Sequence, residues 1–300
     1  MEQVVEIKSL TKTFKDKNAV TDVSFSIKRG EVVAILGPNG AGKTTTMSMM
    51  LGLMSPTKGN VKLFGEDANA KHVREKTGVM LQEVSIMDGL KVKEIISLIR
   101  QYYPNPYSLD YLTQITGLNQ DDLKKRTEKL SGGQKRRVGF ALAVAGNPDL
   151  LFFDEPTVGM DISARKLFWK TVKDLANQGK TIIFSTHYLQ EADDVATRIL
   201  LFKEGTIIAD GTPDEIKKTI SKQSVSFITN DVIPRKMFLE QSFVTDMYGK
   251  DGRIHIVTED TDLVLAKIFE LKIKVNDIRV EKGRLDEAFE QLTGEHKEVI

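Results

Sequence analysis

The chain has 300 residues, enough for one large domain or for a main domain with a smaller one attached. Its 43 basic and 42 acidic residues leave a formal charge of +1, which gives no support to bulk nucleic-acid binding. The absence of cysteine excludes disulfides, thiol chemistry and cysteine-bound metal, and it is compatible with a reducing compartment.

The first elements expected along the chain are strands. Alternating apolar and polar residues over 1–30 predict two short strands with a turn at Asp16–Asn18. Residues 31–54 predict an apolar strand, a Gly-rich turn and a helix, and residues 60–66 and 77–82 predict further strands. The N-terminus lacks the basic start and apolar run of a signal peptide, and no run of eighteen apolar residues predicts a membrane span.

Helices and strands alternate through the following part of the chain. Residues 88–127 have a mostly helical pattern with a break at 103–108, and a further helix is expected from Ser131 to about Gly146. The next expected elements are a buried strand at 150–153, a helix at 163–177, a strand at 181–184, a helix from Tyr188 and a hairpin at 199–211. This alternation predicts an α/β class, with a mostly parallel sheet and helices on its faces.

The character of the sequence changes around Ser221–Ser224. Residues 223–300 predict a small C-terminal domain of the α+β class, with about three strands and two helices. The expected domains are therefore 1–220 and 223–300. The smaller domain could strengthen a dimer, sense a ligand or cap the sheet, and the sequence does not choose among these roles.

One short segment has the pattern of a phosphate-binding loop. Residues 37–44 match G-x-x-x-x-G-K-[ST], and they lie between an expected strand and an expected helix. Glycines permit a tight turn in which backbone N–H groups face a phosphate, and the helix N-terminus adds positive charge. Lys43 is expected to bridge the β- and γ-phosphates, and the Thr44 hydroxyl to ligate Mg²⁺. The expected loop residues are Gly37, Pro38, Asn39, Gly40, Ala41, Gly42, Lys43, Thr44 and Thr45.

Polar side chains also follow three other expected strands. Asp154 ends an apolar strand, where its carboxylate suits Mg²⁺ through water, and Glu155 can act as a general base toward an attacking water. His187 follows a second apolar strand, from which it could reach the γ-phosphate. Gln82 follows a third strand and could sense Mg²⁺ or water. The alternative for Asp154 and Glu155 is that they are only solvated acids at a turn. The alternative for His187 is a surface or core histidine without a role in catalysis.

A second pattern suited to anion binding lies at 130–137, where LSGGQKRR opens an expected helix. The order of motifs along the chain is GPNGAGKTT, Gln82, LSGGQKRR, LLFFDEP, VGMD and STHYLQEAD. With this set, about residues 1–220 of the chain resemble the ATP-binding subunits of ABC transporters. The resemblance implies a P-loop NTPase sheet with an ABC-type helical subdomain at about 88–145, beside the small C-terminal α+β domain.

The resemblance implies a head-to-tail dimer, expected to be a homodimer, with two ATP molecules between the protomers. Each ATP is then held by the phosphate loop of one subunit and by the signature motif of the other. The signature residues are Ser131, Gly132, Gly133 and Gln134. The site of one subunit is thus completed by its partner.

The resemblance also assigns roles to single residues. Glu155 is implied to be the general base, His187 to hold the γ-phosphate, and Asp161 to link the two sites across the dimer. Gln82 is implied to serve catalysis and, with Thr44 and Asp154, the Mg²⁺ ion. Phe14 falls where the family places an aromatic ring that stacks on adenine; its alternative is a core position in the first strand.

Two main classes of ABC protein lack a membrane span. One is the energy-coupling subunit of a transporter whose integral-membrane permease is a separate polypeptide, and the other is a soluble ABC ATPase that acts on nucleic acid or ribosomes. Tandem cassettes, long coiled-coil segments and zinc sites mark the second class and are not visible here, so no nucleic-acid partner is expected. A third possibility, a nucleotide-gated binding module that scarcely hydrolyses ATP, conflicts with intact Glu155 and His187.

The permease is expected to dock on residues 83–99, although these could instead form only an amphipathic surface helix. The segments PTVGMD, STHYLQEADD and RLDEAFEQLTG resemble the bacterial branch that exports drugs, peptide antibiotics or lipids, with import as the alternative. We therefore expect a cytoplasmic ATPase, peripheral on the inner face of the cell membrane through its permease, that uses ATP and Mg²⁺. The transported substrate cannot be read from this chain.

Overall fold

The computed structural model describes residues 2–281, except 16, 221, 222, 230, 232, 234 and 251, together with 285 and 289. It divides into two compact units, Met1–Asp210 and Gly211–Ile300. This division groups the helix α9, Pro213–Ile220, with the second unit, whereas the sequence-based boundary places it with the first. Two features expected from the sequence lie outside the described residues. They are Asp16 in the first turn and most of 284–294, the segment RLDEAFEQLTG.

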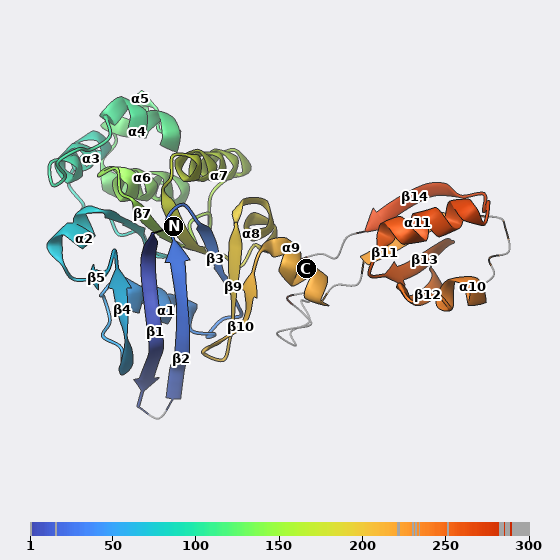
Figure 1. The fold of residues 1–300 in the computed structure, drawn as a ribbon. Helices are drawn as coiled ribbons and strands as arrows, with labels where there is room; N and C mark the ends of the chain where they lie inside the picture. The colour runs from blue at the N-terminus through green and yellow to red at the C-terminus, as the bar shows by residue number, and fades with distance from the viewer. Residues whose placement is uncertain are drawn as a thin grey trace. The chain divides into compact units, whose positions relative to one another are not determined.

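An antiparallel sheet is built mainly from the N-terminal segment (Figure 1). Its strand order is β2-β1-β4-β5. The strands are β1 (Gln3–Phe14), β2 (Lys17–Lys28), β4 (Lys58–Leu63) and β5 (Glu66–Asp67). The pairing of β1 with β2 confirms the two strands predicted over 1–30. The two-residue strand β5 was not predicted, because two residues show no alternation.

A second, mostly parallel sheet forms the centre of the first unit. Its order is β10-β9-β3-β8-β7-β6, and β3, β8, β9, β7 and β6 pair in parallel. The strands are β3 (Val32–Leu36), β6 (Thr77–Met80), β7 (Leu150–Asp154), β8 (Thr181–Ser185), β9 (Arg198–Lys203) and β10 (Thr206–Gly211). Every residue of β3, β7 and β8 is buried, which explains their unbroken apolar runs. The predicted α/β class is confirmed.

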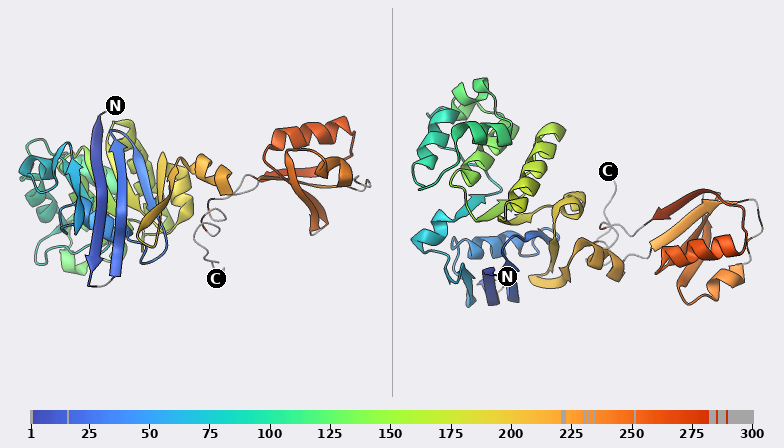
Figure 2. Two further views of the ribbon diagram at one scale, coloured as in Figure 1. Left: turned by 60° about the horizontal axis from the view of Figure 1, so that its bottom comes forward. Right: turned by 45° about the horizontal axis from the view of Figure 1, so that its top comes forward.

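Helices cover this sheet and form a separate group at one end of the unit. The helices are α1 (Lys43–Met50), α2 (Lys71–Glu75), α3 (Val92–Arg100), α4 (Leu109–Thr116), α5 (Gln120–Lys124), α6 (Gly132–Val144), α7 (Ile162–Asn177) and α8 (Leu189–Val195). Figures 1 and 2 show α3–α6 (green) grouped away from the β1–β2 hairpin. Met47, Met49 and Met50 of α1 join a core shared with strands of both sheets. Among the described residues, no helix has the length and apolarity needed to cross a membrane.

The second unit contains an antiparallel sheet with the order β12-β13-β11-β14. After α9 its elements are β11 (Gln223–Ile228), α10 (Arg235–Leu239), β12 (Val244–Lys250), β13 (Arg253–Thr258), α11 (Thr261–Glu270) and β14 (Asn276–Glu281). Phe238 of α10 and Ile268 of α11 pack on a core that includes Phe227 of β11. This β-α-β-β-α-β order is a ferredoxin-like arrangement. The α+β class is confirmed, with four strands in the described part rather than about three.

Candidate active site

The phosphate loop lies between β3 and α1, and two of its glycines are required by close backbone contacts. Gly42 has φ +100°, and a Cβ there would lie 2.5 Å from the carbonyl oxygen of Ala19. A Cβ on Gly37 would collide with the carbonyl oxygen of Phe202. Both distances are far below van der Waals contact, so only glycine fits at these positions. The sequence motif therefore has a steric cause within this chain.

Lys43 and the first turn of α1 present positive charge at this loop. The Lys43 ammonium is buried and donates to the carbonyls of Gly37 and Pro38, at 2.6 and 3.0 Å. Gly42 is the N-cap of α1 and supplies no side-chain cap, and the first turn contains no acid. The first N–H groups of a helix lack intrahelical acceptors, so this end of α1 suits an anion.

A cavity of about 320 Å³ opens at this loop. It is lined by Lys17, Ala19, Asn39, Gly40, Gly42, Lys43, Thr44, Thr45, Gln82 and Glu155. The structure thus brings Gln82 and Glu155 to the phosphate loop, although they lie far from it in the sequence. Lys17 and Ala19 of β2 were not predicted, since nothing in the sequence marks a lysine after a hairpin turn as part of a distant site.

Strand register explains why these side chains meet. Ser185 at the end of β8 pairs with both Ile35 of β3 and Asp154 of β7, and Met80 of β6 pairs with Phe153 of β7. The four parallel strands therefore end at one edge of the sheet. Residues that follow parallel strands at their carboxyl ends line the ligand crevice in folds of this type.

Asp154 is buried at this edge of the sheet, at the end of β7. Its side chain is only 2% exposed, and its Oδ1 accepts a 2.5 Å hydrogen bond from the Ser185 hydroxyl. The backbone N–H of Glu155 donates to the same hydroxyl at 3.0 Å. Ser185 therefore holds the Asp154 carboxylate and the backbone of Glu155. The sequence motifs do not single out Ser185, because its bond to Asp154 depends on the pairing of two distant strands.

Glu155 leaves β7 with a left-handed backbone, at φ 49°. Arg136 of α6 donates to the Glu155 carbonyl at 2.9 Å, which stabilises this turn of the chain. Burial lowers the pKa of Arg136, whereas the nearby charges of Glu155 and Asp154 act in the opposite direction. The arrangement directs the Glu155 carboxylate toward the cavity that it lines.

His187 contacts Glu155 directly. Nδ1 of His187 lies 2.5 Å from Oε2 of Glu155, and the histidine ring is about half exposed. With Nδ1 engaged by the carboxylate, Nε2 is the ring nitrogen left for another partner. A carboxylate and an imidazole in hydrogen-bond contact beside a phosphate loop can polarise a water and contact a phosphate.

Phe14 lies at the end of β1, opposite Lys17. Its ring is 46% exposed, and the Lys12 ammonium lies 5.2 Å from the ring centroid. The alternative of a core position is therefore wrong. Phe14 does not itself line the cavity, but its cross-strand neighbour Lys17 does.

The signature residues cap α6. Ser131 accepts from the Gln134 N–H at 3.3 Å, while the Gln134 side chain accepts from the Ser131 N–H at 3.0 Å. A Cβ on Gly132 would meet nothing within 4 Å. A Cβ on Gly133 would lie 3.3 Å from the Gly159 carbonyl, so the signature motif lies against the segment 158–161.

Asp161 caps α7 by accepting from the Ala164 N–H at 2.8 Å. Neither Asp161 nor the signature residues are among those that line the cavity of their own chain. The structure therefore gathers the phosphate loop, Gln82, Glu155 and His187, and leaves the signature motif apart from them.

Several known proteins are similar to this chain. A family model described as "ABC transporter" matches residues 20–158. The Nod factor export ATP-binding protein I of Burkholderia orbicola (strain AU 1054) is 37% identical over 215 residues, which cover 70% of this chain and 71% of that protein. The probable multidrug ABC transporter ATP-binding protein YbhF of Escherichia coli (strain K12) is 36% identical over 223 residues, or 72% of this chain and 38% of that protein.

A solved structure supports the same similarity. It is a dimeric ATP-binding cassette in a post-hydrolysis state, bound to ADP and Pi, and it is 28% identical to this chain. The superposition has a TM-score of 0.64 and covers 69% of this chain and 98% of the cassette.

Proposed function

The chain belongs to the ABC transporter family of ATP-binding proteins, and we propose that it powers an exporter whose permease is a separate polypeptide. One observation carries the proposal. The phosphate loop, Gln82 and Glu155 line one cavity, and the His187 ring is in hydrogen-bond contact with the Glu155 carboxylate. A phosphate cradle, a candidate base and a second polar group at one site are the components that ATP hydrolysis requires.

Each residue of this site has a proposed role. Lys43 contacts the β- and γ-phosphates, and the N–H groups of the loop and of α1 surround them. Glu155 is the general base toward the attacking water, and His187 contacts the γ-phosphate through Nε2. Stacking of the Phe14 ring on adenine is supported by its exposure at the end of β1.

The oxygen donors at the site fit Mg²⁺, which prefers oxygen ligands. Thr44 and Gln82 line the cavity and would hold the ion with their hydroxyl and amide oxygens, while Asp154 would act through water. The Ser185 hydroxyl keeps the Asp154 carboxylate in place for this role. When bound, the ion neutralises charge that develops on the phosphates.

We propose that a second subunit, expected to be another copy of this chain, completes the site. Among the residues that the structure describes, no contact requires glycine at position 132, since a Cβ there would meet open space. Close approach of a phosphate held by a partner gives a reason for glycine at this position. Ser131, Gly133 and Gln134 shape the same helix end, and Asp161 lies on the segment that contacts Gly133.

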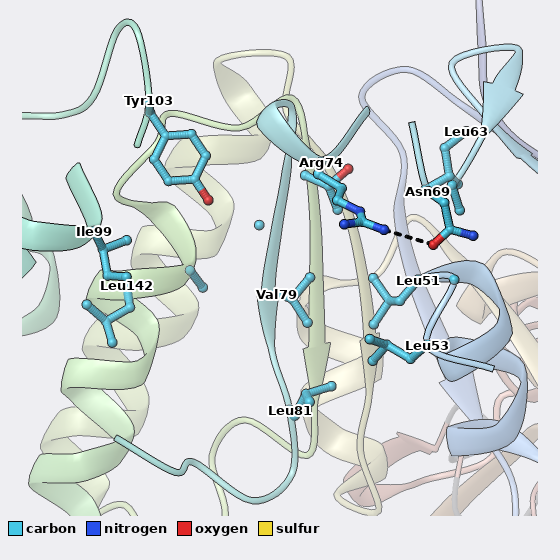
Figure 3. A pocket seen from close by; sticks show the side chains of 15 residues that line it. Leu51, Leu53, Leu63, Asn69, Arg74, Val79, Leu81, Ile99, Tyr103 and Leu142 are labelled. Carbon is cyan, nitrogen blue, oxygen red and sulfur yellow. Dashed lines mark hydrogen bonds between the residues drawn. The ribbon is translucent and has the colours of Figure 1, made fainter. Parts of the chain in front are cut away.

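The permease is proposed to dock in a second cavity of about 600 Å³ (Figure 3). Figure 3 shows apolar side chains around it, among them Leu51, Leu53, Val79, Leu81, Ile99 and Leu142. Such a lining suits the apolar face of a short helix. Arg74 adds one cation, held by the Asn69 side chain at 2.9 Å, and would pair with an acid or a helix C-terminus of the permease.

This cavity differs from the docking segment expected from the sequence. Of the residues 83–99, only Ile99 is among those that line it. Helix α3 instead buries Val92, Ile95 and Ile96. The proposed docking surface is therefore formed by segments from both sides of Gln82.

Export rather than import is supported by the names of the similar proteins, one a Nod factor export protein and one a probable multidrug transporter protein. We propose drugs, peptide antibiotics or lipids as the substrate class. In this proposal the chain lies at the inner face of the cell membrane, bound to its permease.

The proposal is tested by purifying the tagged chain from gently solubilised membranes of its native cell. Recovery of a multi-span membrane protein in stoichiometric amount is expected, and the type of this partner fixes the direction of transport. Recovery of ribosomal or nucleic-acid-binding proteins instead would contradict the proposal and favour a soluble ABC ATPase.

A further inference from the structure

Glu191 is a buried acid that has no role in the site described above. It lies on α8, and it is only 7% exposed, whereas Asp194 on the same helix is exposed. Burial of a carboxylate is unfavourable unless the charge is paired and hydrogen-bonded. The partners of Glu191 therefore indicate what the buried charge does.

Each carboxylate oxygen of Glu191 accepts a hydrogen bond from a different catalytic segment. The Thr157 hydroxyl donates to Oε1 at 2.8 Å, and the Thr186 hydroxyl donates to Oε2 at 2.8 Å. Thr157 lies two residues after Glu155, and Thr186 directly precedes His187. Both threonines are buried, so water does not compete freely for these bonds.

A third segment reaches the same carboxylate through Arg165. Its Nε lies 3.6 Å from Oε1 of Glu191, which is an ion pair rather than a hydrogen bond. The Arg165 guanidinium also lies 4.4 Å from the ring centroid of Tyr188. Arg165 lies in the first turn of α7, and its backbone N–H donates to the backbone carbonyl of Asp161 at 2.9 Å.

We propose that Glu191 is a positioning residue for ATP hydrolysis, which joins the segments that carry Glu155, His187 and Asp161. The inference rests on the proposed function of those three residues. Glu191 does not line the nucleotide cavity, so it acts through its neighbours. When the segment that carries Glu155 moves, the Glu191 carboxylate transmits the movement to the segments that carry His187 and Asp161.

A carboxylate is suited to this junction because both of its oxygens accept hydrogen bonds. A glutamine side chain has one acceptor oxygen and one donor NH₂ group. Because a threonine hydroxyl can accept as well as donate, Glu191→Gln keeps part of the hydrogen bonding to Thr157 and Thr186. Glu191→Ala removes it. Misplacement of a catalytic group by about 1 Å can reduce turnover by about a hundredfold.

The first test measures ATP turnover and nucleotide affinity on the full chain. We expect turnover to fall from wild type to Glu191→Gln to Glu191→Ala, with a loss of about tenfold or more for alanine and an affinity within about twofold of wild type. Thr186→Val, which keeps the shape and removes one hydroxyl, should give an intermediate loss. Asp194→Asn is the matched control, and its turnover should equal that of wild type. In the described part of the chain, the only side chain that the Asp194 carboxylate bonds is that of exposed Gln190.

Amide hydrogen exchange provides a second test that does not depend on hydrolysis. In Glu191→Ala we expect exchange to accelerate by about tenfold or more in both 156–161 and 186–188, while β3 and α1 keep wild-type rates. Unchanged exchange in either segment, acceleration confined to α8, or acceleration throughout the first unit would overturn the inference. Wild-type turnover in Glu191→Ala would overturn it as well.

The two proposals fail in different ways. A wild-type chain that binds ATP without hydrolysing it would contradict the proposed function. The exchange rates would still decide whether Glu191 joins the segments 156–161 and 186–188. Normal wild-type turnover together with normal Glu191→Ala turnover would contradict only the inference.

Discussion

Leu81 and Gln82 are consecutive residues that line two different cavities. Leu81 lines the apolar cavity of about 600 Å³, and Gln82 lines the nucleotide cavity of about 320 Å³. Both residues directly follow the end of β6, so the two cavities meet at this point of the chain. The proposed docking and hydrolysis sites are therefore joined through one peptide bond, and we expect a shift of the backbone at Leu81 to move Gln82 as well.

This relationship gives a prediction for Leu81→Asp. Docking would bury a carboxylate at position 81 between the mainly apolar lining of this cavity and the apolar face of the permease helix, so permease binding should weaken by about tenfold or more. Nucleotide affinity of the isolated chain should stay at the wild-type value. Phe269→Asp, at an exposed apolar position of α11 outside the cavity, is the control and should bind normally. Equal co-purification of both variants with the permease would show that docking occurs elsewhere.

Glu155→Gln should remove the general base while keeping the size of the side chain. We expect ATP turnover to fall by about 10²- to 10⁴-fold, because base catalysis contributes this much. ATP-bound dimer should accumulate, which size-exclusion chromatography with ATP detects. Glu66→Gln is the matched control, since Glu66 forms a similar 2.5 Å contact with His72. Turnover of Glu155→Gln at the wild-type rate would contradict the assigned role.

Gly132→Ala should separate folding from catalysis. The added methyl group meets nothing within 4 Å in the described structure, so the free energy of unfolding should be unchanged or rise by up to about 1 kcal/mol. Turnover should nevertheless fall, because the methyl group occupies space reserved for the phosphate of the partner site. Gly42→Ala should lower both stability and nucleotide binding, since its methyl group lies 2.5 Å from the Ala19 carbonyl. A Gly132→Ala variant with full activity would contradict completion of the site by a partner.

Asp122 gives a prediction for the dependence of stability on pH. It is buried and accepts from Gln134 of the signature motif at 2.7 Å and from Lys125 at 3.0 Å. Burial opposes ionisation, but the bonds from Lys125 and the Asn119 N–H outweigh it and hold the pKa of Asp122 below its ordinary value. A lowered folded-state pKa means that the carboxylate stabilises the fold at neutral pH, and that this contribution is lost as pH falls through the lowered value.

Asp122→Asn should therefore reduce the free energy of unfolding at pH 7 by about 1–3 kcal/mol. The difference from wild type should shrink below about pH 4, where the unfolded carboxyl is protonated. Urea denaturation at a series of pH values measures both effects. Asp121→Asn, at an exposed acid of the same helix, should behave as wild type at every pH. A difference that stays constant from pH 7 to pH 3 would contradict the assignment.

The strands and helices of the first unit were largely predictable, because burial on both faces leaves an unbroken apolar run and helix ends carry recognisable residues. Ser131 and Gly146, for example, bound α6 closely. The assignment of strands to sheets was not predictable. Val5 of β1 pairs with Leu63 of β4 across nearly sixty residues, and alternation alone does not state which strand is the partner. Helix α2, with five residues, is too short to show a period.

The site was predictable where spacing within a motif carries the chemistry, as in 37–44 and at Glu155. Ser185 and Lys17 were missed, because their contacts with Asp154 and with the phosphate loop depend on how distant strands pair. Glu191 was missed for a similar reason. A glutamate on a short helix is usually exposed, and only the folded arrangement of Thr157 and Thr186 reveals its burial.

The central claim is that one subunit completes the ATP site of another, and mixing two inactive variants tests it most directly. Lys43→Ala disables the phosphate loop, and Gly132→Arg blocks the signature motif, so each variant alone should be inactive. A mixed dimer contains one site with an intact loop and an intact signature, and random pairing should restore about a quarter of wild-type turnover. A mixture that stays inactive, or a Gly132→Arg chain that hydrolyses ATP alone, would contradict this account.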